Sequence, residues 1–200
     1  MKEIVLASSN PGKVREINQL LATLDLHVQP QSEFGVIDAE ETGLTFVENA
    51  ILKARNATRH TGLPAIADDS GIEVDALNGA PGIYSARYAG SNASDRANLE
   101  KLLAELDGLP EAKRSARFQC LMVFMEHAND PTPVICQGTW EGRILFTARG
   151  DNGFGYDPVF YVPTHDCSSA ELTAEVKNTL SHRGQALRQL VTSLQHYREQ

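Results

Sequence analysis

The chain has 200 residues, of which 42% are hydrophobic and 22% are charged, so it can bury a sizeable core and has an ordinary globular composition. Its formal net charge of −8 at pH 7 disfavours non-specific binding to a nucleic-acid backbone. The three cysteines are widely spaced and form no Cys-x-x-Cys pair, which argues against a disulfide framework or a zinc site and favours a reducing compartment.

No stretch of the sequence has the length and apolar character of a transmembrane helix. The apolar run Ile4 to Ala7 is too short for the core of a signal peptide. We therefore expect a cytoplasmic protein with no membrane partner and no nucleic-acid partner. Because the sequence shows no internal repeat, low-complexity tract or long linker, we expect a single domain over residues 1–200.

The first predicted element is a buried strand from Glu3 to Ala7, which ends in the polar run Ser8-Ser9-Asn10-Pro11-Gly12-Lys13. An amphipathic helix should follow, because apolar residues recur on one face at Val14, Ile17, Leu20, Leu21 and Leu24. Lys13 lies in the first turn of this helix, where a cation opposes the helix dipole unless an anion lies beside it.

The same polar run could hold a phosphate group. Backbone N–H groups, two hydroxyls, an amide and an ammonium would form the cradle, the side chains coming from Ser8, Ser9, Asn10 and Lys13. The run is not a Walker A loop, because the Gly-x-x-x-x-Gly-Lys-Ser/Thr pattern is absent. An ordinary strand-to-helix connection with a solvated lysine is the alternative.

A second short strand is expected around Val28, followed by a polar stretch that contains the acidic pair Glu40-Glu41. Thr45 and Glu48 have capping-box spacing, which predicts that a helix begins there. Its apolar face consists of small residues suited to close packing on a sheet: Val47, Ala50, Ile51, Ala54 and Ala57. Lys53 and Arg55 lie off this face, and we expect at least one of them to be a solvated surface charge.

The stretch from Pro64 to Gly90 brings charged and small residues together. A short buried strand, Ala65 to Ala67, leads into Asp68 and Asp69, and Ser70-Gly71 is typical of a turn. We therefore expect the two carboxylates at a sheet edge or rim, where burial is costly unless they are paired or bind a cation. Together with Arg87 they form an inventory that fits a Mg²⁺–phosphate site, although an acidic surface turn is the alternative.

The second half of the chain adds one helix and several consecutive strands. The helix should start at Ser94 or Asp95 and end before Gly108. The predicted strands are 116–126, 134–140, 144–148 and 159–162, with residues 141–143 joining two of them, and a final helix follows Ser181. Strand–helix alternation followed by consecutive strands predicts a mixed α/β sheet with helices on its faces.

Two late segments carry side chains that could bind a ligand. Residues 153–158, Gly-Phe-Gly-Tyr-Asp-Pro, can present an aromatic ring for base stacking, or can form a tight turn with core aromatics. In Ser181-His182-Arg183-Gly184, the His182 and Arg183 side chains could donate to carbonyl oxygens on a base edge. Lys177 is a single cation, a type of residue that is most often solvated.

Six motifs occur in order along the chain. They are Ser-Ser-Asn-Pro-Gly-Lys at 8–13, Glu-Asn-Ala-Ile-Leu-Lys-Ala at 48–54, Ala-Asp-Asp-Ser-Gly at 67–71, Gly-Ala-Pro-Gly-Ile-Tyr-Ser-Ala-Arg-Tyr at 79–88, Gly-Phe-Gly-Tyr-Asp-Pro at 153–158 and Ser-His-Arg-Gly at 181–184. Over essentially its whole length the chain resembles the inosine triphosphate pyrophosphatase family, the non-canonical purine nucleoside triphosphate pyrophosphohydrolases. Ser8 is a small departure, because relatives often carry threonine there, but the hydroxyl is retained.

The resemblance implies an elongated mixed β-sheet flanked by helices, with two lobes and a central nucleotide-binding cleft. It implies Mg²⁺-dependent hydrolysis of ITP, dITP and XTP between the α- and β-phosphates, giving the monophosphate and pyrophosphate. Such an activity removes deaminated purines from the nucleotide pool. The resemblance also implies a homodimer.

The resemblance further implies roles for individual residues. Asp69 would be the general base and a Mg²⁺ ligand with Glu40, although Glu41 and Asp68 stay open as the second acid. The phosphates would be held by Ser8, Ser9, Asn10, Pro11, Gly12 and Lys13, and Ser70 would contact the substrate. Phe154 would stack on the purine, Gly155, Tyr156 and Asp157 would line its pocket, and Lys177, His182 and Arg183 would contact the base edge or the phosphates.

Two other functions stay open from the sequence. A related pyrophosphatase acting on pyrimidine or modified-base triphosphates would share the phosphate and metal residues and differ in its base contacts. A nucleotide-binding module without catalysis is the second, but binding alone does not require a general base such as Asp69.

Overall fold

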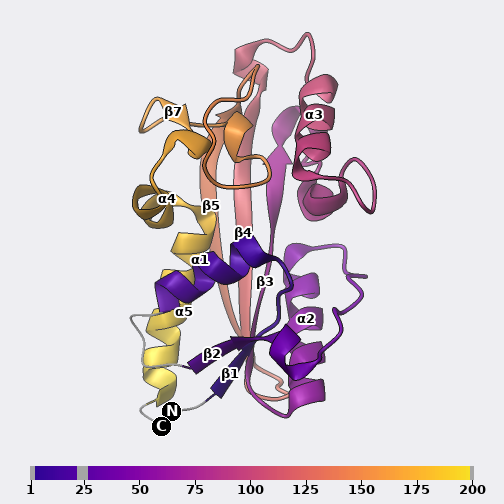
Figure 1. Cartoon of the computed structure of the whole chain (residues 1–200), viewed down its shortest axis with the longest axis vertical. Helices are drawn as coiled ribbons and strands as arrows, with labels where there is room; N and C mark the ends of the chain where they lie inside the picture. The colour runs from indigo at the N-terminus through magenta and orange to yellow at the C-terminus, as the bar shows by residue number, and fades with distance from the viewer. Residues whose placement is uncertain (1–2, 22–26, 199–200) are drawn as a thin grey trace. The chain divides into compact units, whose positions relative to one another are not determined.

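The computed structural model describes residues 3–21 and 27–198. In this part of the chain, seven strands form one sheet in the order β2-β1-β3-β4-β5-β6-β7 (Figure 1). They are β1 (Glu3–Leu6), β2 (His27–Pro30), β3 (Ala65–Val74), β4 (Ser115–Met125), β5 (Val134–Ile144), β6 (Phe160–Val162) and β7 (Cys167–Ser168). Since β1 runs parallel to β2 and β3, whereas β5, β6 and β7 pair antiparallel, the predicted mixed sheet is confirmed.

Five α-helices accompany the sheet in the described part of the chain. They are α1 (Pro11–Leu21), α2 (Phe46–Thr61), α3 (Asp95–Glu105), α4 (Ala174–Leu180) and α5 (His182–Arg198). The sequence predicted α1, α2, α3 and α5 but missed the short α4. Leu24, predicted on the apolar face of α1, lies outside the described residues. None of the helices described is both long and apolar enough to cross a bilayer.

Contacts between residues divide the chain into two compact units. Unit 1 comprises Met1–Asp69, Cys120–Gly138 and Arg183–Gln200, and unit 2 comprises Ser70–Gln119 and Thr139–His182. The three long strands β3, β4 and β5 each contribute residues to both units. The predictions of a single domain and of a nucleotide cleft between two lobes stay predictions.

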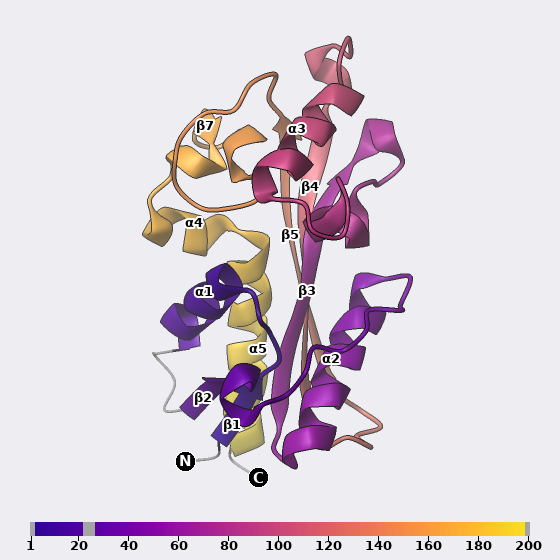
Figure 2. The same cartoon turned by 45° about the vertical axis from the view of Figure 1, so that its right-hand side comes forward.

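Unit 1 has a separate apolar cluster on each face of its part of the sheet. Ile4 and Leu6 of β1 pack with residues of α1 and α5, whereas Val5 and Ala7 pack with alanines of α2. This alternation follows from the two-residue period of a strand. Figure 2 shows the same arrangement, with α1 and α5 on one side of β3 and α2 on the other. The small residues of α2, Ala50, Ala54 and Ala57, are fully buried, as predicted.

Unit 2 is organised around one aromatic-rich core. Leu102 and Leu106 from the α3 region pack in the same cluster as Phe118 of β4 and Trp140 of β5. The Phe118 ring contacts Phe160 of β6, with 4.6 Å between ring centroids. This core supports the loop between β5 and β6, which carries residues 153–157.

Helix capping agrees with the sequence. Thr45 caps α2 by accepting from the Glu48 N–H, and Ser94 caps α3 by accepting from the Ala97 N–H. The Glu48 carboxylate also accepts from the Thr45 hydroxyl and from the Leu44 N–H. Both predicted starts are therefore confirmed, because their side chains satisfy N–H groups that a first helical turn leaves open.

Two predictions about strand ends are wrong. Ser70 and Gly71 form no turn but continue β3, so Asp68 and Asp69 lie inside a strand that has β1 and β4 as its neighbours. Residues 141–143 likewise form no break, because β5 runs unbroken from Val134 to Ile144, and the separate strand predicted over 144–148 does not form. A Cβ atom on Gly142 would come within 2.4 Å of the Tyr161 carbonyl oxygen, so this glycine permits close strand approach and does not mark a turn.

Candidate active site

The polar run after β1 forms the first turn of α1 in unit 1. The Asn10 Oδ1 atom accepts from the N–H groups of Gly12 and Lys13 at 2.9 and 3.2 Å, while the Ser8 hydroxyl accepts from the Asn10 N–H. Ser9 donates its hydroxyl to Asp38 Oδ2 at 2.8 Å, and Pro11 is the first helical residue. The structure thus brings the predicted phosphate residues together, with two of their N–H groups capped by Asn10.

The anion required beside Lys13 is Asp68. Lys13 Nζ lies 3.0 Å from Asp68 Oδ2, and Arg183 Nε, from the first turn of α5, lies 3.6 Å from the same oxygen. Arg183 also pairs with Glu16 of α1. Burial by itself raises the pKa of Asp68, but Lys13, Arg183 and Lys53 outweigh it and hold this pKa well below its ordinary value. Asp68 is therefore an ionised counter-ion.

Asp69 lies in a different environment one residue later. Lys53 Nζ, from α2, is 3.0 Å from Asp69 Oδ1 and 3.0 Å from Glu41 Oε1. Among the described residues, the buried Oδ2 atom of Asp69 has no hydrogen-bond partner. Burial raises the pKa of Asp69 even though Lys53 and Lys13 lower it. A buried carboxylate with a raised pKa and one oxygen without a hydrogen bond is suited to accept a proton.

The strand geometry explains this difference between neighbouring carboxylates. Successive side chains of a strand point to opposite faces of the sheet. Asp68 lies on the face covered by α1 and α5, where Lys13 and Arg183 reach it, and Asp69 lies on the face covered by α2, where Lys53 reaches it. The same strand thus delivers one carboxylate to each face.

Lys53 corrects an expectation from the sequence. Neither Lys53 nor Arg55 is a free surface charge, because Arg55 Nε donates to the Ala128 carbonyl oxygen and Lys53 joins two carboxylates. Burial lowers the pKa of Lys53, but Asp69, Asp68 and Glu41 outweigh it and raise this pKa, so the side chain stays charged. Its four-carbon stem lets it reach Asp69 from off the apolar face of α2.

The aromatic loop in unit 2 is built around Asp157. This buried carboxylate accepts from Lys177 Nζ at 2.7 Å and from the Phe154 N–H at 2.9 Å through Oδ2, and from the Ser169 hydroxyl at 2.9 Å through Oδ1. A Cβ atom on Gly153, whose φ is +80°, would come within 2.1 Å of Asp157 Oδ2. The predicted pocket-lining Asp157 thus holds the loop and Lys177 together.

Lys177 is not a solvated surface cation, and its predicted contact with the base edge or the phosphates stays a prediction. It is buried and paired with Asp157, and its Nζ lies over the Phe154 ring at 5.1 Å from the centroid. The isolated lysine in the sequence gave no sign of this, because its partner lies 20 residues away. One face of the Phe154 ring is thereby next to an ammonium group.

His182 and Arg183 are neighbours in sequence but belong to different units. His182 stacks on Phe118 in unit 2, with 4.7 Å between centroids and 11° between ring planes. Arg183 lies in unit 1 beside Asp68. Of the other predicted residues, Ser70 and the 154–157 loop belong to unit 2. The structure therefore gathers the predicted site residues into two sets, one in each unit.

A family model described as the Ham1 family matches residues 4–193, a range that contains all six motifs. The chain belongs to the Ham1 family. It is 63% identical over 194 residues to a protein of Vibrio vulnificus named dITP/XTP pyrophosphatase, and the match covers 97% of each chain. The predicted resemblance to the non-canonical purine triphosphate pyrophosphohydrolases is confirmed.

Solved Ham1 structures share the fold. A HAM1 protein from Coxiella burnetii has a TM-score of 0.92 at 56% identity, covering 98% of this chain and 100% of its own. The Ham1 protein of Staphylococcus aureus has a TM-score of 0.87 at 47% identity, again covering 98% of this chain and 100% of its own. The mixed α/β architecture of this Ham1 chain is thus the one found in the solved structures of these relatives.

The carboxylates of this Ham1 chain can be tested for their fit to a divalent cation. Asp69 offers a buried oxygen without a hydrogen-bond partner, and Glu41 Oε1 lies within 3.0 Å of the same ammonium as Asp69. Over residues 3–21 and 27–198, no group of three or more His, Cys, Asp or Glu residues is arranged to hold a metal ion. Mg²⁺ commonly uses one or two carboxylates and completes its shell with water and phosphate oxygens, so the residues fit it.

Glu40 and Glu41 differ in this Ham1 chain. The Glu41 side chain pairs with Lys53, whereas the Glu40 side chain is exposed and its carbonyl oxygen accepts from the Thr42 N–H. The predicted metal role of Glu40 stays a prediction. The sequence left Glu41 open as an alternative metal ligand but assigned no site role to Lys53. The position of Lys53 within the 48–54 motif was the one signal that could have indicated such a role.

Proposed function

We propose that this chain hydrolyses ITP, dITP and XTP to the nucleoside monophosphate and pyrophosphate. The observation that carries the proposal is the 63% identity, over 97% of both chains, to a protein named dITP/XTP pyrophosphatase. The Ham1 family model, which matches residues 4–193, spans every motif assigned to substrate contact. The activity would remove deaminated purines from the nucleotide pool.

The two carboxylates of β3 support a division of labour in this reaction. Asp69 Oδ2 takes a proton from the attacking water, the water oxygen bonds to the α-phosphorus, and pyrophosphate leaves with the electron pair of the broken P–O bond. The raised pKa of Asp69 makes it a better base than Asp68, whose charge is neutralised by Lys13 and Arg183. Lys13 and Lys53, which are paired with Asp68, Asp69 and Glu41, would also contact a triphosphate that carries about three to four negative charges, and the proposed metal ion would offset the rest.

Mg²⁺ is the cofactor we propose, held by Asp69 with Glu41 or Glu40. The bound ion would neutralise phosphate charge as it develops. Support comes from the Asp69 Oδ1 and Glu41 Oε1 atoms, which both lie 3.0 Å from Lys53 Nζ and so face a common position. Lys53 Nζ contacts both Asp69 Oδ1 and Glu41 Oε1, so a Mg²⁺ ion bound by these oxygens would share them with the ammonium group.

Base recognition is the proposed task of Phe154, Lys177, His182 and Arg183, as the family resemblance implies. Phe154 would stack on the purine, with Lys177 fixing the ring from one side. A donor from His182 or Arg183 to O6 would select 6-keto purines, because adenine presents an amino group there. An unmatched donor costs about 1–3 kcal/mol, which corresponds to roughly 10–100-fold discrimination per contact.

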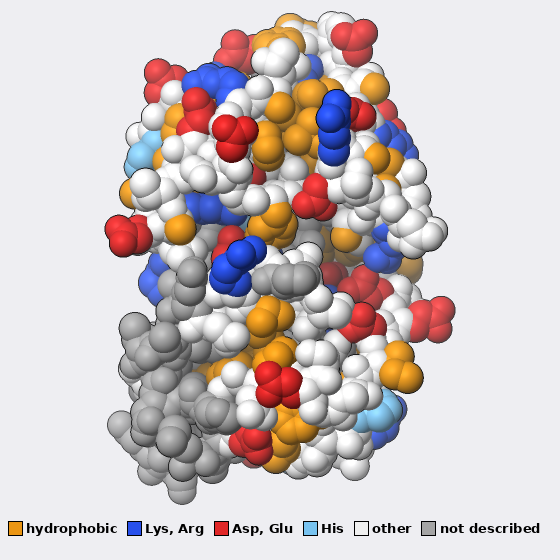
Figure 3. Space-filling model, viewed as in Figure 1, with side chains coloured by type: hydrophobic (Ala, Val, Ile, Leu, Met, Phe, Trp, Pro, Cys, Tyr) orange, Lys and Arg blue, Asp and Glu red, His pale blue; other side chains and the backbone are white. Residues whose placement is uncertain are grey.

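We also propose a cytoplasmic homodimer. The reduced state of Cys120, Cys136 and Cys167, all free, fits a reducing compartment. Apolar side chains lie among charged ones on the face drawn in Figure 3, and a partner copy could cover exposed residues such as Ile37 and Phe146. Light scattering after size-exclusion chromatography tests this proposal, and a mass near 21.9 kDa would reject it.

The experiment that tests the proposed function is a panel of triphosphates with Mg²⁺, in which pyrophosphate release is measured for each. We expect turnover of ITP, dITP and XTP, with ATP and the pyrimidine triphosphates at least tenfold slower. Preference for dTTP or UTP would instead favour the related pyrimidine or modified-base pyrophosphatase. Binding without turnover of any triphosphate would favour a nucleotide-binding module.

A further inference from the structure

The loop that carries Phe154 has no regular secondary structure, so its hydrogen bonds must define its shape. Gly150, Gly153 and Gly155 all have positive φ, at +79°, +80° and +62°. Because glycine has more backbone conformations available than any other residue, these three positions do not fix the conformation of the loop by themselves. Asp157 fixes the N-terminal side of the Phe154 peptide, as described above. The C-terminal side, at Gly155, needs a separate contact.

That contact comes from Asp95, 60 residues earlier in the chain. The Gly155 N–H donates to Asp95 Oδ2 at 2.9 Å, and Asp95 is the first residue of α3 in the same unit. The next residue of the loop is anchored as well, because the Tyr156 hydroxyl donates to the Ser85 carbonyl oxygen at 2.8 Å. Burial raises the pKa of Tyr156, so this hydroxyl stays protonated and keeps donating.

From this geometry we propose that Asp95 is a positioning residue for base recognition. Its carboxylate fixes the Gly155 peptide and thereby helps to set the position of the Phe154 ring, while Asp157 holds the Phe154 backbone N–H on the other side. The inference rests on the proposed function, since it assumes that Phe154 meets the base. Asp95 itself need not touch the substrate.

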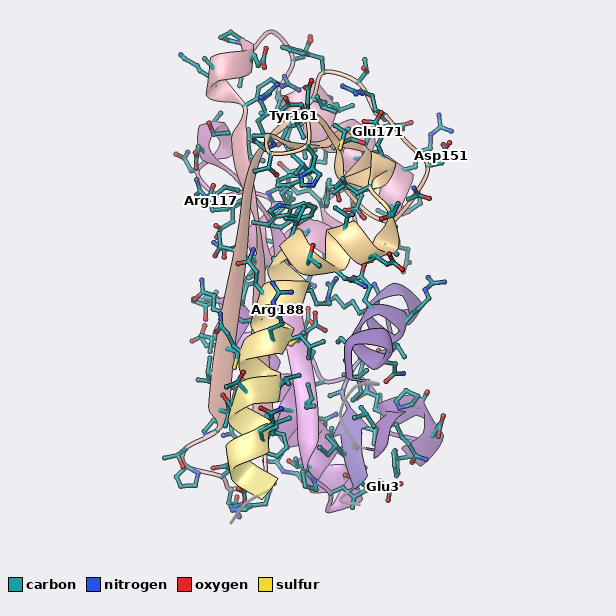
Figure 4. All side chains as sticks on the ribbon, turned by 90° about the vertical axis from the view of Figure 1, so that its left-hand side faces the viewer. Glu3, Arg117, Asp151, Tyr161, Glu171 and Arg188 are labelled. Atoms are coloured by element: carbon teal, nitrogen blue, oxygen red, sulfur yellow. The ribbon has the colours of Figure 1, made fainter. Side chains whose placement is uncertain are left out.

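A capping role alone would also favour an acidic residue at this position, because a carboxylate in the first turn interacts well with the helix dipole. The cap of α3 is nevertheless Ser94, whose hydroxyl accepts from the Ala97 N–H. Ser94→Ala therefore weakens α3 without removing the Gly155 contact, and it provides a matched control for Asp95→Ala. Asp151→Asn is a second control, because Asp151 is an exposed acid of the same loop that points outward (Figure 4).

The test compares wild type, Asp95→Ala, Asp95→Asn, Ser94→Ala and Asp151→Asn with ITP as substrate. Losing one charge-assisted hydrogen bond in a partly exposed position should raise KM by about three- to tenfold in Asp95→Ala, with kcat changed less than twofold. Asp95→Asn keeps an acceptor oxygen and should recover most of the KM effect. The two controls should keep the wild-type KM, even if Ser94→Ala lowers the melting temperature.

A second measurement follows hydrogen exchange at the Gly155 amide. Exchange should accelerate in Asp95→Ala and stay at the wild-type rate in Ser94→Ala. An unchanged KM in Asp95→Ala, or an equal rise of KM in Ser94→Ala, would overturn the proposal. If wild type releases no pyrophosphate from ITP, the proposed function is rejected. Hydrogen exchange tests the role of Asp95 independently of that result, because an unchanged exchange rate at Gly155 in Asp95→Ala would reject Asp95 as the residue that holds the loop.

Discussion

Adjacent aspartates with opposite roles are the main feature at the scale of single residues. Lys13 and Arg183 hold the pKa of the buried Asp68 well below its ordinary value, whereas burial raises the pKa of Asp69 despite its pairing with Lys53. The sequence placed both in one acidic group and left open which of Asp68, Glu40 and Glu41 accompanies Asp69. It could not separate them, because the separation depends on which helix packs on each face of β3.

Asp68→Asn tests the counter-ion role. The change removes the carboxylate from two buried cations, which should lower the free energy of unfolding by about 3–5 kcal/mol at pH 7. Because the folded pKa of Asp68 is depressed, its contribution is present above the unfolded value of about 3.9 and is lost as pH falls through the folded pKa. Urea unfolding at pH 7 and pH 3 measures the difference between wild type and variant.

The difference should begin to shrink at pH 3, because the unfolded wild-type chain takes up a proton on Asp68 there while the folded carboxylate stays ionised. Glu16→Gln is the control, because it removes the other carboxylate partner of Arg183 and leaves Asp68 in place. We expect a smaller loss of stability from Glu16→Gln. Equal losses, or a loss in Asp68→Asn that is independent of pH, would contradict the role given to Asp68.

Lys53→Met tests whether Lys53 sets the pKa of Asp69, the proposed general base. Lys53 lowers the pKa of Asp69, so its removal should raise that pKa further above the ordinary value. The general base must be deprotonated, and the acidic limb of kcat/KM against pH should therefore move to higher pH. Arg55→Met, two residues along α2, should leave the limb in place. A limb that moves to lower pH in Lys53→Met would contradict the assignment.

At the scale of elements, the sequence predicted buried strands and helix caps, but it did not predict where long strands continue without a break. The buried strand β1 and the caps at Thr45 and Ser94 are local properties, and the sequence predicted them correctly. Ser70-Gly71 resembles a turn, but both residues continue β3, whose neighbours in the sheet are β1 and β4. Gly142 was also predicted to mark a break between strands. A glycine is needed there because the neighbouring strand β6 approaches its backbone closely.

Asp157→Asn tests the support of the aromatic loop. It removes the buried carboxylate paired with Lys177, so we expect a loss of about 3–5 kcal/mol in the free energy of unfolding and a raised KM for ITP. Asp151→Asn changes an exposed acid of the same loop and should alter stability by less than about 0.5 kcal/mol. Thermal unfolding and steady-state kinetics measure both effects, and similar stabilities for the two variants would contradict the buried role.

At the scale of the whole molecule, the assigned residues fall into a charged set in unit 1 and an aromatic set in unit 2. Lys13 and Asp69 belong to the first set, and Phe154 and Lys177 belong to the second. The family resemblance predicted the members of both sets, because its motifs are spread along the chain. It did not predict the internal pairings, such as Lys177 with Asp157, that hold each set together.

Lys13→Ala and Phe154→Ala test this separation. Lys13→Ala should raise KM for every triphosphate through lost phosphate contact, whereas Phe154→Ala should weaken ITP binding through lost stacking, worth about 1–3 kcal/mol. Because each side chain has its own partners, the two effects on log kcat/KM should add in the double variant to within about 0.5 kcal/mol. Strong non-additivity in steady-state kinetics would contradict two independent sets.

The central claim is that Asp69 is the base in hydrolysis of a non-canonical purine triphosphate. The most direct measurement compares ITP turnover and ITP binding in wild type and Asp69→Asn, with Mg²⁺ present and with IMP and pyrophosphate both quantified. We predict that kcat falls by about 10²–10⁴, the usual contribution of a general base, while the Kd for ITP changes only a few-fold. Hydrolysis of ITP by Asp69→Asn at the wild-type rate would contradict the claim.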